Sequence, residues 1–407
     1  MRGNRKLLGG SLWIFFLGLL LAFPMWLGGA AAQAQGKVKI GAVIPISGPM
    51  GIFGKRAIWG MELAAEVVNN GGGIKSLGGA KIELLMKDAA MKPPVAIRET
   101  ERLAKEGVVV IMGHMFPPAT FASSQSAEKL GIPYITPVDI SPAMTKRGFK
   151  RFFQINAKAT EWARNQVAAL KSFSEVTGKS FKRVGLIHLD EQYGTASAKG
   201  QTIFLKKMGF EKVADVAYSP RTKDVTSQVT QLKAAKPDVV LAVSFLPDAV
   251  LVRKTMARLG LNVPLFGTGA GYSEPLFVKK LGKLAEGTLT IHGWNGDLPG
   301  PVQAEMRKRF KAKFGEEMTT HAALHYQAVM VAAAAVEKAG SRDRAAVAKA
   351  LHGIRLGPGP QLVLPQKQLE FDATGYNKHA TPVVYQVQDG KFVTVFPSQW
   401  AQGKPRL

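Results

Sequence analysis

The sequence predicts an α/β fold of two lobes, each built on a mainly parallel sheet covered by helices. Three observations lead to this prediction. The chain has 407 residues, which is enough for two domains. Strand-like and helix-like segments alternate along it, and the alternation restarts after a break near residues 154–157. Because 46% of the residues are hydrophobic, long disordered regions are not expected.

The first half alternates strand and helix from residue 37 onward. Its first strand places apolar residues at every second position, and its first helix ends at Gly71-Gly72-Gly73, a strong stop. The run of apolar residues at 108–112 is typical of a strand covered on both faces. The sequence predicts strands over 37–45, 81–88, 108–112 and 133–136, and helices over 55–70, 95–106 and 119–130.

The second half repeats this pattern and then adds a helical region and a hairpin. Asp389-Gly390 lies between two strand-like segments and predicts the hairpin turn. Parallel strands bring their carboxyl ends to one edge, where the loops are expected to hold a ligand. The sequence predicts strands over 183–189, 213–217, 238–244, 264–267, 382–387 and 391–396, and helices over 160 onward, 195–208, 225–235, 248–259, 301–314, 320–339 and 342–351.

The first 34 residues have the order of an export signal. Arg2, Arg5 and Lys6 precede an apolar stretch over 12–27, and Ala32-Gln33-Ala34 is a suitable cleavage motif. An uncleaved membrane anchor is the alternative, but the apolar stretch is shorter than the roughly 20 residues of a spanning helix. We therefore expect a cleaved signal peptide over 1–34 and a mature protein in the periplasm.

Charge and composition exclude several classes of protein. The net charge is +25, from 54 Lys and Arg against 29 Asp and Glu, but the basic residues are spread along the chain rather than clustered. This favours a solvated basic surface over a nucleic-acid-binding protein. The chain has no cysteine, which excludes disulfides, thiolate metal sites, iron–sulfur clusters, thiol nucleophiles and a lipid-modified cysteine.

Motifs for catalysis and cofactor binding are missing from the sequence. The glycine-rich segment 48–56 lacks the spacing of a phosphate-binding loop, and Arg56 stands where Ser or Thr is needed. His321 and His325 have helical spacing, but Ala322 replaces the glutamate of a metalloprotease. No nucleophile elbow is present. We therefore expect no enzyme, no cofactor and no metal, and an exported enzyme remains a minor alternative.

Several short motifs together resemble the leucine/isoleucine/valine-binding protein family, a family with the type I periplasmic binding fold. Each is weak alone, but they follow the family's order across nearly the whole mature chain. They include Ile40-Gly41-Ala42 followed by Ser47-Gly48-Pro49, Ile111-Met112-Gly113-His114, Gly131-Ile132-Pro133, Asp190 to Gly194, Tyr326-Gln327-Ala328 and Gln388-Asp389-Gly390-Lys391.

The resemblance implies a periplasmic receptor for an ABC importer, with two Rossmann-like lobes joined by three crossover strands. Matched positions place the crossovers near 154–157, 289–294 and 371–381. They assign residues 37–155 plus 291–371 to lobe I, and 156–290 plus 372–407 to lobe II. The implied partners are a small-molecule ligand and an inner-membrane ABC permease. We expect the protein to be a monomer and to bind no nucleic acid.

The matched pocket positions depart from those of the family's amino-acid binders. Pro117 and Ile140 stand at the hydroxyl positions that hold the carboxylate, and Gly269 at the acidic position that holds the ammonium. Such losses each cost about 1–3 kcal/mol, so a free α-amino acid is expected to bind poorly. The other matched wall positions are Phe53, Phe116, Val138, Tyr193 and Phe245.

This lining predicts a small apolar or aromatic ligand, which could carry a carboxylate. We expect Ser244, Thr268, Thr120 and Tyr193 to supply polar contacts, and Phe53→Ala to weaken binding without unfolding the protein. Two alternatives stay open. One is a branched-chain amino-acid receptor for amino-acid transport, and the other is a ligand-sensing receptor domain of the same fold.

Overall fold

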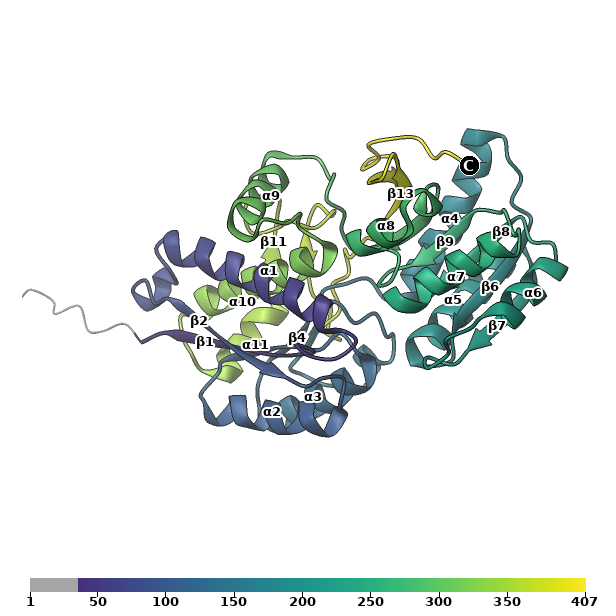
Figure 1. Ribbon diagram of the computed structural model, residues 1–407. Helices are drawn as coiled ribbons and strands as arrows, with labels where there is room; N and C mark the ends of the chain where they lie inside the picture. The colour runs from purple at the N-terminus through teal and green to yellow at the C-terminus, as the bar shows by residue number, and fades with distance from the viewer. Residues whose placement is uncertain (1–35) are drawn as a thin grey trace, which may run out of the picture. The chain divides into compact units, whose positions relative to one another are not determined.

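A computed structural model describes residues 36–407, which form two sheets with helices on both faces of each (Figure 1). The predicted signal peptide lies outside the described residues. The first sheet has the order β2-β1-β3-β4-β5, and all its strand pairs are parallel. Its strands are β1 (Val38–Ile44), β2 (Ile82–Asp88), β3 (Val110–Gly113), β4 (Tyr134–Thr136) and β5 (Phe152–Gln154).

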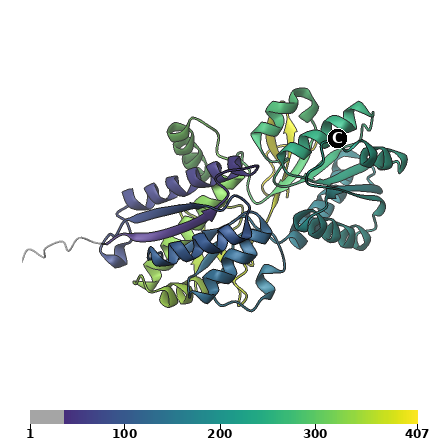
Figure 2. The same cartoon turned by 60° about the horizontal axis from the view of Figure 1, so that its bottom comes forward.

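Successive residues of β1 face opposite sides of the first sheet, and this alternation separates two cores. Ile40 and Ala42 pack with α1 (Gly51–Asn70) and α10 (Thr320–Ala339), whereas Val43 packs with α2 (Pro93–Lys105) and α3 (Pro117–Lys129). Figure 2 brings the α2–α3 face forward. Helices α9 (Pro301–Phe314) and α11 (Arg344–His352) complete this half, with the two short strands β11 (Arg355–Leu356) and β12 (Leu369–Glu370).

Helices α1 and α10 approach each other closely at Gly60. A Cβ atom at this position would lie 2.0 Å from the carbonyl oxygen of Ala322 and 2.8 Å from its Cα atom. Only glycine fits such a contact without movement of one helix. The contact fixes the first turn of α10 against the first sheet's core.

The second sheet has the order β14-β13-β10-β9-β8-β6-β7. Its strand pairs are parallel from β7 to β10, and β13 and β14 extend the sheet in antiparallel fashion. The strands are β6 (Arg183–Leu189), β7 (Glu211–Tyr218), β8 (Val239–Val243), β9 (Leu265–Thr268), β10 (Leu289–His292), β13 (Val383–Gln388) and β14 (Lys391–Phe396).

Two groups of helices cover the faces of this second sheet. Leu186 and Leu241 pack with α4 (Ala159–Thr177) and α5 (Gln192–Lys207), and Ile187 and Val240 lie in the core with the helices of the opposite face. Those helices are α6 (Thr226–Ala234), α7 (Leu246–Arg258) and α8 (Pro275–Leu281). Each sheet therefore has buried faces on both sides, as the apolar strand sequences indicate.

The chain passes between the two sheets three times. It leaves the first sheet after β5, leaves the second after β10 to form α9–α11, and enters the second again at β13. Two of these passages are hydrogen-bonded side by side, because the Gln154 N–H donates to the Gly375 carbonyl (2.8 Å) and the Asn377 N–H donates to the Gln154 carbonyl (2.9 Å).

The predicted α/β fold class is confirmed, and most predicted elements lie within a few residues of the observed ones. Helices α2 and α3 begin at Pro93 and Pro117, earlier than predicted, because proline suits the first turn of a helix, where its missing N–H costs nothing. The seven-residue α8 is too short to show helical periodicity and was not predicted. Across residues 36–407, no helix combines the length and the apolar character needed to span a membrane.

Candidate ligand-binding site

A cavity of about 40 Å³ lies where the carboxyl ends of strands from both sheets meet. The first sheet contributes residues that follow β3 and β4, and the second contributes residues that follow β6, β8 and β9. This is the edge at which ligands bind in open α/β sheets. The lining consists of Met50, Met115, Pro117, Val138, Asp139, Ile140, Trp162, Tyr193, Phe245, Ala270, His292 and His321.

Tyr193 and Phe245 form an aromatic wall on the second sheet's side. Their rings stack with centroids 5.5 Å apart and planes 29° apart. The carboxylate of Glu191 holds the start of α5 by accepting hydrogen bonds from the N–H groups of Tyr193 and Gly194, both at 3.0 Å. The Tyr193 hydroxyl donates to the Thr268 carbonyl, which fixes the ring against the cavity.

Trp162, His292 and His321 form a second row of rings. The His292 ring lies 4.9 Å from Trp162 and 5.4 Å from His321, in both cases edge to face. His292 Nδ1 accepts a hydrogen bond from the Gly293 N–H (2.8 Å), so a neutral His292 carries its proton on Nε2. Burial holds the pKa of His292 well below its ordinary value, and the nearby His321 lowers it further. His292 is therefore a neutral donor.

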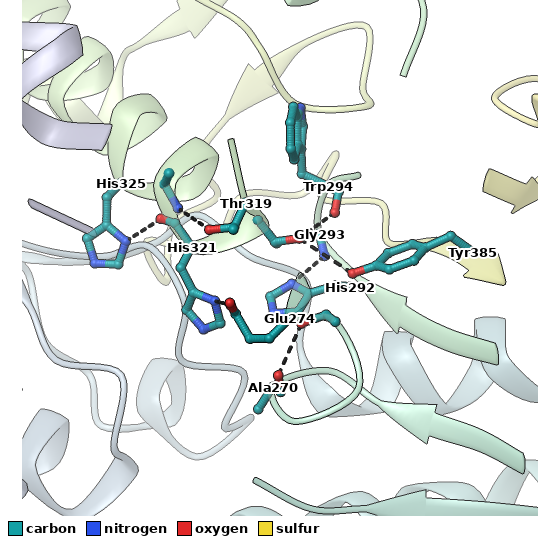
Figure 3. Close-up of polar contacts among 12 residues, drawn as sticks. Ala270, Glu274, His292, Gly293, Trp294, Thr319, His321, His325 and Tyr385 are labelled. Atoms are coloured by element: carbon teal, nitrogen blue, oxygen red, sulfur yellow. Dashed lines mark hydrogen bonds and ion pairs between the residues drawn. The ribbon is translucent and has the colours of Figure 1, made fainter. Parts of the chain in front are cut away.

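The lining residue His321 contacts the side chain of Glu274 (Figure 3). Its Nδ1 lies 3.0 Å from Glu274 Oε1, and both side chains are buried. His321 belongs to α10, which packs on the first sheet, whereas Glu274 precedes α8, which packs on the second. This contact therefore links elements that belong to different sheets. His325 points away from it and bonds the His321 carbonyl through Nδ1 (2.8 Å).

Asp139 is the buried acidic residue of the lining, with 3% of its surface exposed. Its Oδ1 accepts a hydrogen bond from the Ser141 N–H (2.8 Å), but Oδ2 has no partner among residues 36–407. Burial raises the pKa of Asp139 to about 6. The nearby Thr120 hydroxyl lowers that pKa, although its proton is directed to the carbonyl oxygens of His114 and Phe116.

The hydroxyl groups expected to contact a ligand are bonded within the protein instead. Ser244 Oγ lies 2.7 Å and 2.9 Å from the hydroxyls of Tyr218 and Tyr272. Thr268 Oγ1 donates to Gln166 Oε1 (3.2 Å). Together with the bonds of Thr120 and Tyr193 described above, these contacts show that all four hydroxyl groups are hydrogen-bonded within the protein. The polar contacts of the cavity come from other residues.

Five of the eight predicted site residues line the cavity, namely Pro117, Val138, Ile140, Tyr193 and Phe245. Phe53, Phe116 and Gly269 lie nearby but do not form its surface. Phe53 is 1% exposed and packs under the His321 ring at 4.6 Å, and Phe116 precedes α3. Gly269 has φ of +53°, and a Cβ there would lie 2.6 Å from the Trp162 ring.

The core position of Phe53 changes one expectation. Removing a buried phenylalanine side chain typically costs about 3–5 kcal/mol of stability. Phe53→Ala is therefore expected to lower the stability of the fold, so a loss of binding in this variant would not by itself identify Phe53 as a ligand contact.

Sequence reasoning missed Asp139, Trp162 and His292. Asp139 stands between Val138 and Ile140, two positions that the sequence assigns to the wall, but alternation along an extended segment turns it away from them. In the structure residues 138–140 form an irregular segment after β4, and Val138, Asp139 and Ile140 all belong to the cavity lining. Trp162 and His292 could have been found only by their nearness to the implied crossovers.

The charge of the lining contrasts with the basic surface of the protein. None of the lining residues, all of them within the described chain, is Lys or Arg. No set of three or more His, Asp and Glu side chains that could hold a metal ion occurs among residues 36–407. The cavity thus offers one carboxylate, two histidines, an indole and an apolar wall.

A family model described as periplasmic binding protein matches residues 37–390. The Leu/Ile/Val-binding protein homolog 7 of Brucella suis is 31% identical over 388 residues, which cover 93% of this chain and 96% of that protein. The chain belongs to the periplasmic binding protein family. The predicted resemblance to its leucine/isoleucine/valine-binding members is confirmed, and with it the general role of a solute-binding component for a small ligand.

Solved structures of the same fold extend this comparison. The branched-chain amino acid transporter substrate binding protein LivJ from Streptococcus pneumoniae, in complex with isoleucine, superposes with a TM-score of 0.76 at 24% identity, covering 89% of this chain and 100% of that one. A solute binding protein of an ABC transporter from R. palustris, in complex with benzoate, gives 0.76 at 22% identity, covering 88% and 96%. These likenesses establish the fold.

Proposed function

We propose that this periplasmic binding protein delivers a small ligand with an apolar body to an inner-membrane ABC permease. The single observation that carries the proposal is the cavity at the meeting edge of the two sheets, walled by Tyr193, Phe245 and Trp162. Aromatic walls with a few polar groups are typical of small-molecule sites. The two solved proteins described above are named as transporter components, which supports a transport role over an enzymatic one.

The size of the cavity supports a mechanism of opening and closing. At about 40 Å³ it is far smaller than the roughly 300–1,000 Å³ of typical small-molecule sites. A ligand therefore enters only when the walls separate, and the three passages between the sheets are the natural hinges. Under this proposal lobe I comprises residues 37–155 plus 291–371, and lobe II comprises 156–290 plus 372–407.

Residues 1–34 act as a cleaved signal peptide, which places the mature chain in the periplasm. The protein acts as a monomer that the permease recognises in its closed form, and it neither catalyses a reaction nor binds nucleic acid. The even spread of basic residues supports this last point.

A branched-chain amino acid is the second candidate ligand. It is favoured by the name of the Brucella suis relative and by Asp139, whose carboxylate could face an ammonium group. It is disfavoured by the internal bonding of the hydroxyl groups and by the absence of Lys and Arg from the cavity lining within residues 36–407.

Thermal-shift and calorimetric titration of the mature protein test the proposal. The probes are leucine, isoleucine, benzoate, 3-phenylpropionate, 3-phenylpropylamine and 3-phenylpropionamide. We expect saturable binding of at least one probe, weakened about tenfold or more by Tyr193→Ala, because an aromatic contact of the wall is lost. Phe204→Ala, on the same helix but outside the cavity lining, is the control. Binding of no probe, or equal effects of both variants, would contradict the proposed site.

A further inference from the structure

The polar side of the cavity restricts the chemistry of the ligand, an inference that rests on the proposed function. Asp139 presents an oxygen that has no partner in the described part of the chain, although the side chain is almost completely buried. A buried acceptor without a partner is costly, so such an atom in a cavity lining is a natural contact for a ligand donor. A ligand N–H or O–H group would satisfy Asp139 Oδ2.

Hydrogen-bond donors also belong to the lining. Trp162 is 2% exposed, and its Nε1 likewise finds no acceptor among residues 36–407. An indole nitrogen can only donate. His292, edge to face with Trp162, carries its proton on Nε2, as its bond to Gly293 requires. These neutral donors suit a carbonyl, ether or hydroxyl oxygen of a ligand.

At three of the helix starts around the cavity, the groups that could hold a carboxylate already have other partners. These are the starts of α3, α5 and α7; α1 and α10 also begin at lining residues, and the first N–H groups of a helix are natural anion-binding groups. At α5 these N–H groups donate to Glu191, and at α7 the Phe245 N–H donates to Asp248 Oδ2 (3.1 Å). At α3 the Phe116 N–H donates to His114 Nδ1 (3.0 Å), and Pro117 has no N–H to offer.

The charges near the cavity oppose an anion as well. Asp139 lines it, and Glu274 lies behind His321 with its second oxygen, Oε2, buried and lacking a partner within the described residues. In a cavity of low effective dielectric, a ligand carboxylate beside an ionised Asp139 would be repelled rather than held. Lys and Arg residues elsewhere on the described surface do not reach the lining.

From these contacts we infer that the ligand is a neutral or cationic molecule that donates a hydrogen bond to Asp139 Oδ2, accepts one from Trp162 Nε1, and carries no carboxylate. Its apolar body lies against Tyr193 and Phe245. Amides with an aromatic or aliphatic body have all of this chemistry, whereas simple amines supply the donor to Asp139 but no acceptor for Trp162. Benzoate-like acids and free amino acids do not, because each brings an anionic group that the cavity cannot pair.

The test uses three probes that share one aromatic body: 3-phenylpropionamide, 3-phenylpropylamine and 3-phenylpropionate. We expect the amide or the amine to bind to the mature protein at least about tenfold more tightly than the carboxylate, since a hydrogen bond to a charged group carries that much discrimination. The amide and the amine distinguish a neutral ligand from a cationic one. Tighter binding of 3-phenylpropionate or benzoate would overturn the inference and leave the proposed function intact, whereas binding of no probe would contradict both.

Two variants test the assigned atoms. Asp139→Asn keeps the Oδ1 atom that accepts the Ser141 N–H but replaces the free oxygen with an NH₂ group, so the turn is preserved. It should weaken the preferred probe about 10- to 100-fold. Asp190→Asn removes the same charge from an exposed position outside the lining and should change affinity less than twofold.

Trp162→Phe keeps an aromatic ring in place but removes the only donor of the side chain. It should weaken the amide about tenfold, and the amine less, because the amine offers no acceptor to the indole. Unchanged affinity of the amide in Asp139→Asn, with folding verified by circular dichroism, would overturn the assignment of Asp139. Equal losses for the amide and the amine in Trp162→Phe would show a packing role and overturn the assignment of Trp162.

Discussion

Asp139→Asn should make the ligand-free protein more stable at neutral pH. Burial raises the pKa of this carboxyl group from its ordinary value of 3.8 to about 6. The Ser141 N–H, Thr120 and Arg147 act in the opposite direction, and the charge of Glu191 adds to the rise. Because the folded protein holds the proton more tightly than the unfolded chain, the ionised carboxylate destabilises the fold above that pKa.

The magnitude follows from the difference between the two pKa values. One pKa unit corresponds to about 1.4 kcal/mol, so the ionised, buried Asp139 costs about 3 kcal/mol at neutral pH. This cost is absent below the unfolded pKa and develops as the pH rises through the range from about 4 to 6. Asparagine cannot ionise, and it keeps the bond to Ser141.

Urea denaturation of the mature protein, followed by circular dichroism, measures the effect. At about pH 7.5 the variant should exceed the wild type by up to about 3 kcal/mol, and at about pH 4 the two should nearly coincide. Asp190→Asn, at an exposed position outside the lining, is the matched control. An equal gap at both pH values, or a variant less stable than the wild type at neutral pH, would refute the reasoning about the buried charge.

Three further predictions concern the packing around the cavity. Gly60→Ala places a methyl group about 1 Å too close to the Ala322 carbonyl and should lower the free energy of unfolding, measured by urea denaturation, by about 1–3 kcal/mol. Gly357→Ala is the control and should be neutral, because nothing lies within 4 Å of a Cβ atom there. Equal midpoints for the two variants would contradict the close approach of α1 and α10. Phe53→Ala should lower the free energy of unfolding by about 3–5 kcal/mol, and Phe53→Leu should lower it by clearly less. A small and equal loss in both variants would contradict the burial of Phe53 in the core. Glu274→Gln removes the carboxylate charge from the contact with His321 and should weaken the link between α8 and α10. The ligand-free variant should then open more often and give a larger radius of gyration than the wild type in small-angle X-ray scattering. An unchanged radius would show that this contact does not hold the cavity closed.

Much of the fold could be predicted because its elements carry local patterns. The buried strands β3 and β8 are short apolar runs between turn residues, and α10 begins and ends at the predicted residues. Strand β10 was harder to predict, because Leu289–His292 shows neither a clear alternation of apolar and polar residues nor a long apolar run. Its pairing with β9 and β13 defines it as a strand. Such a strand is specified by tertiary pairing rather than by its own sequence.

The candidate site was predictable in position but not in polarity. Tyr193 and Phe245 follow strands, so the rule for parallel sheets places them at the carboxyl edge whatever their side chains do. The polar character depends on which hydrogen bonds are already used, and sequence does not show this. Ser244 looks like a free hydroxyl in the sequence, whereas the structure bonds it to Tyr218 and Tyr272. Asp139 gives the opposite case, an acid whose free oxygen becomes evident only from its surroundings.

The tightness of the cavity has a kinetic consequence. If the unliganded molecule spends most of its time in the form described here, the cavity is too small to admit a solute. The association rate is then set by the frequency of opening rather than by diffusion. The apparent affinity is then reduced by the fraction of time spent shut. Under the proposed mechanism, the contact between His321 and Glu274 would then affect the rate of capture as well as the affinity.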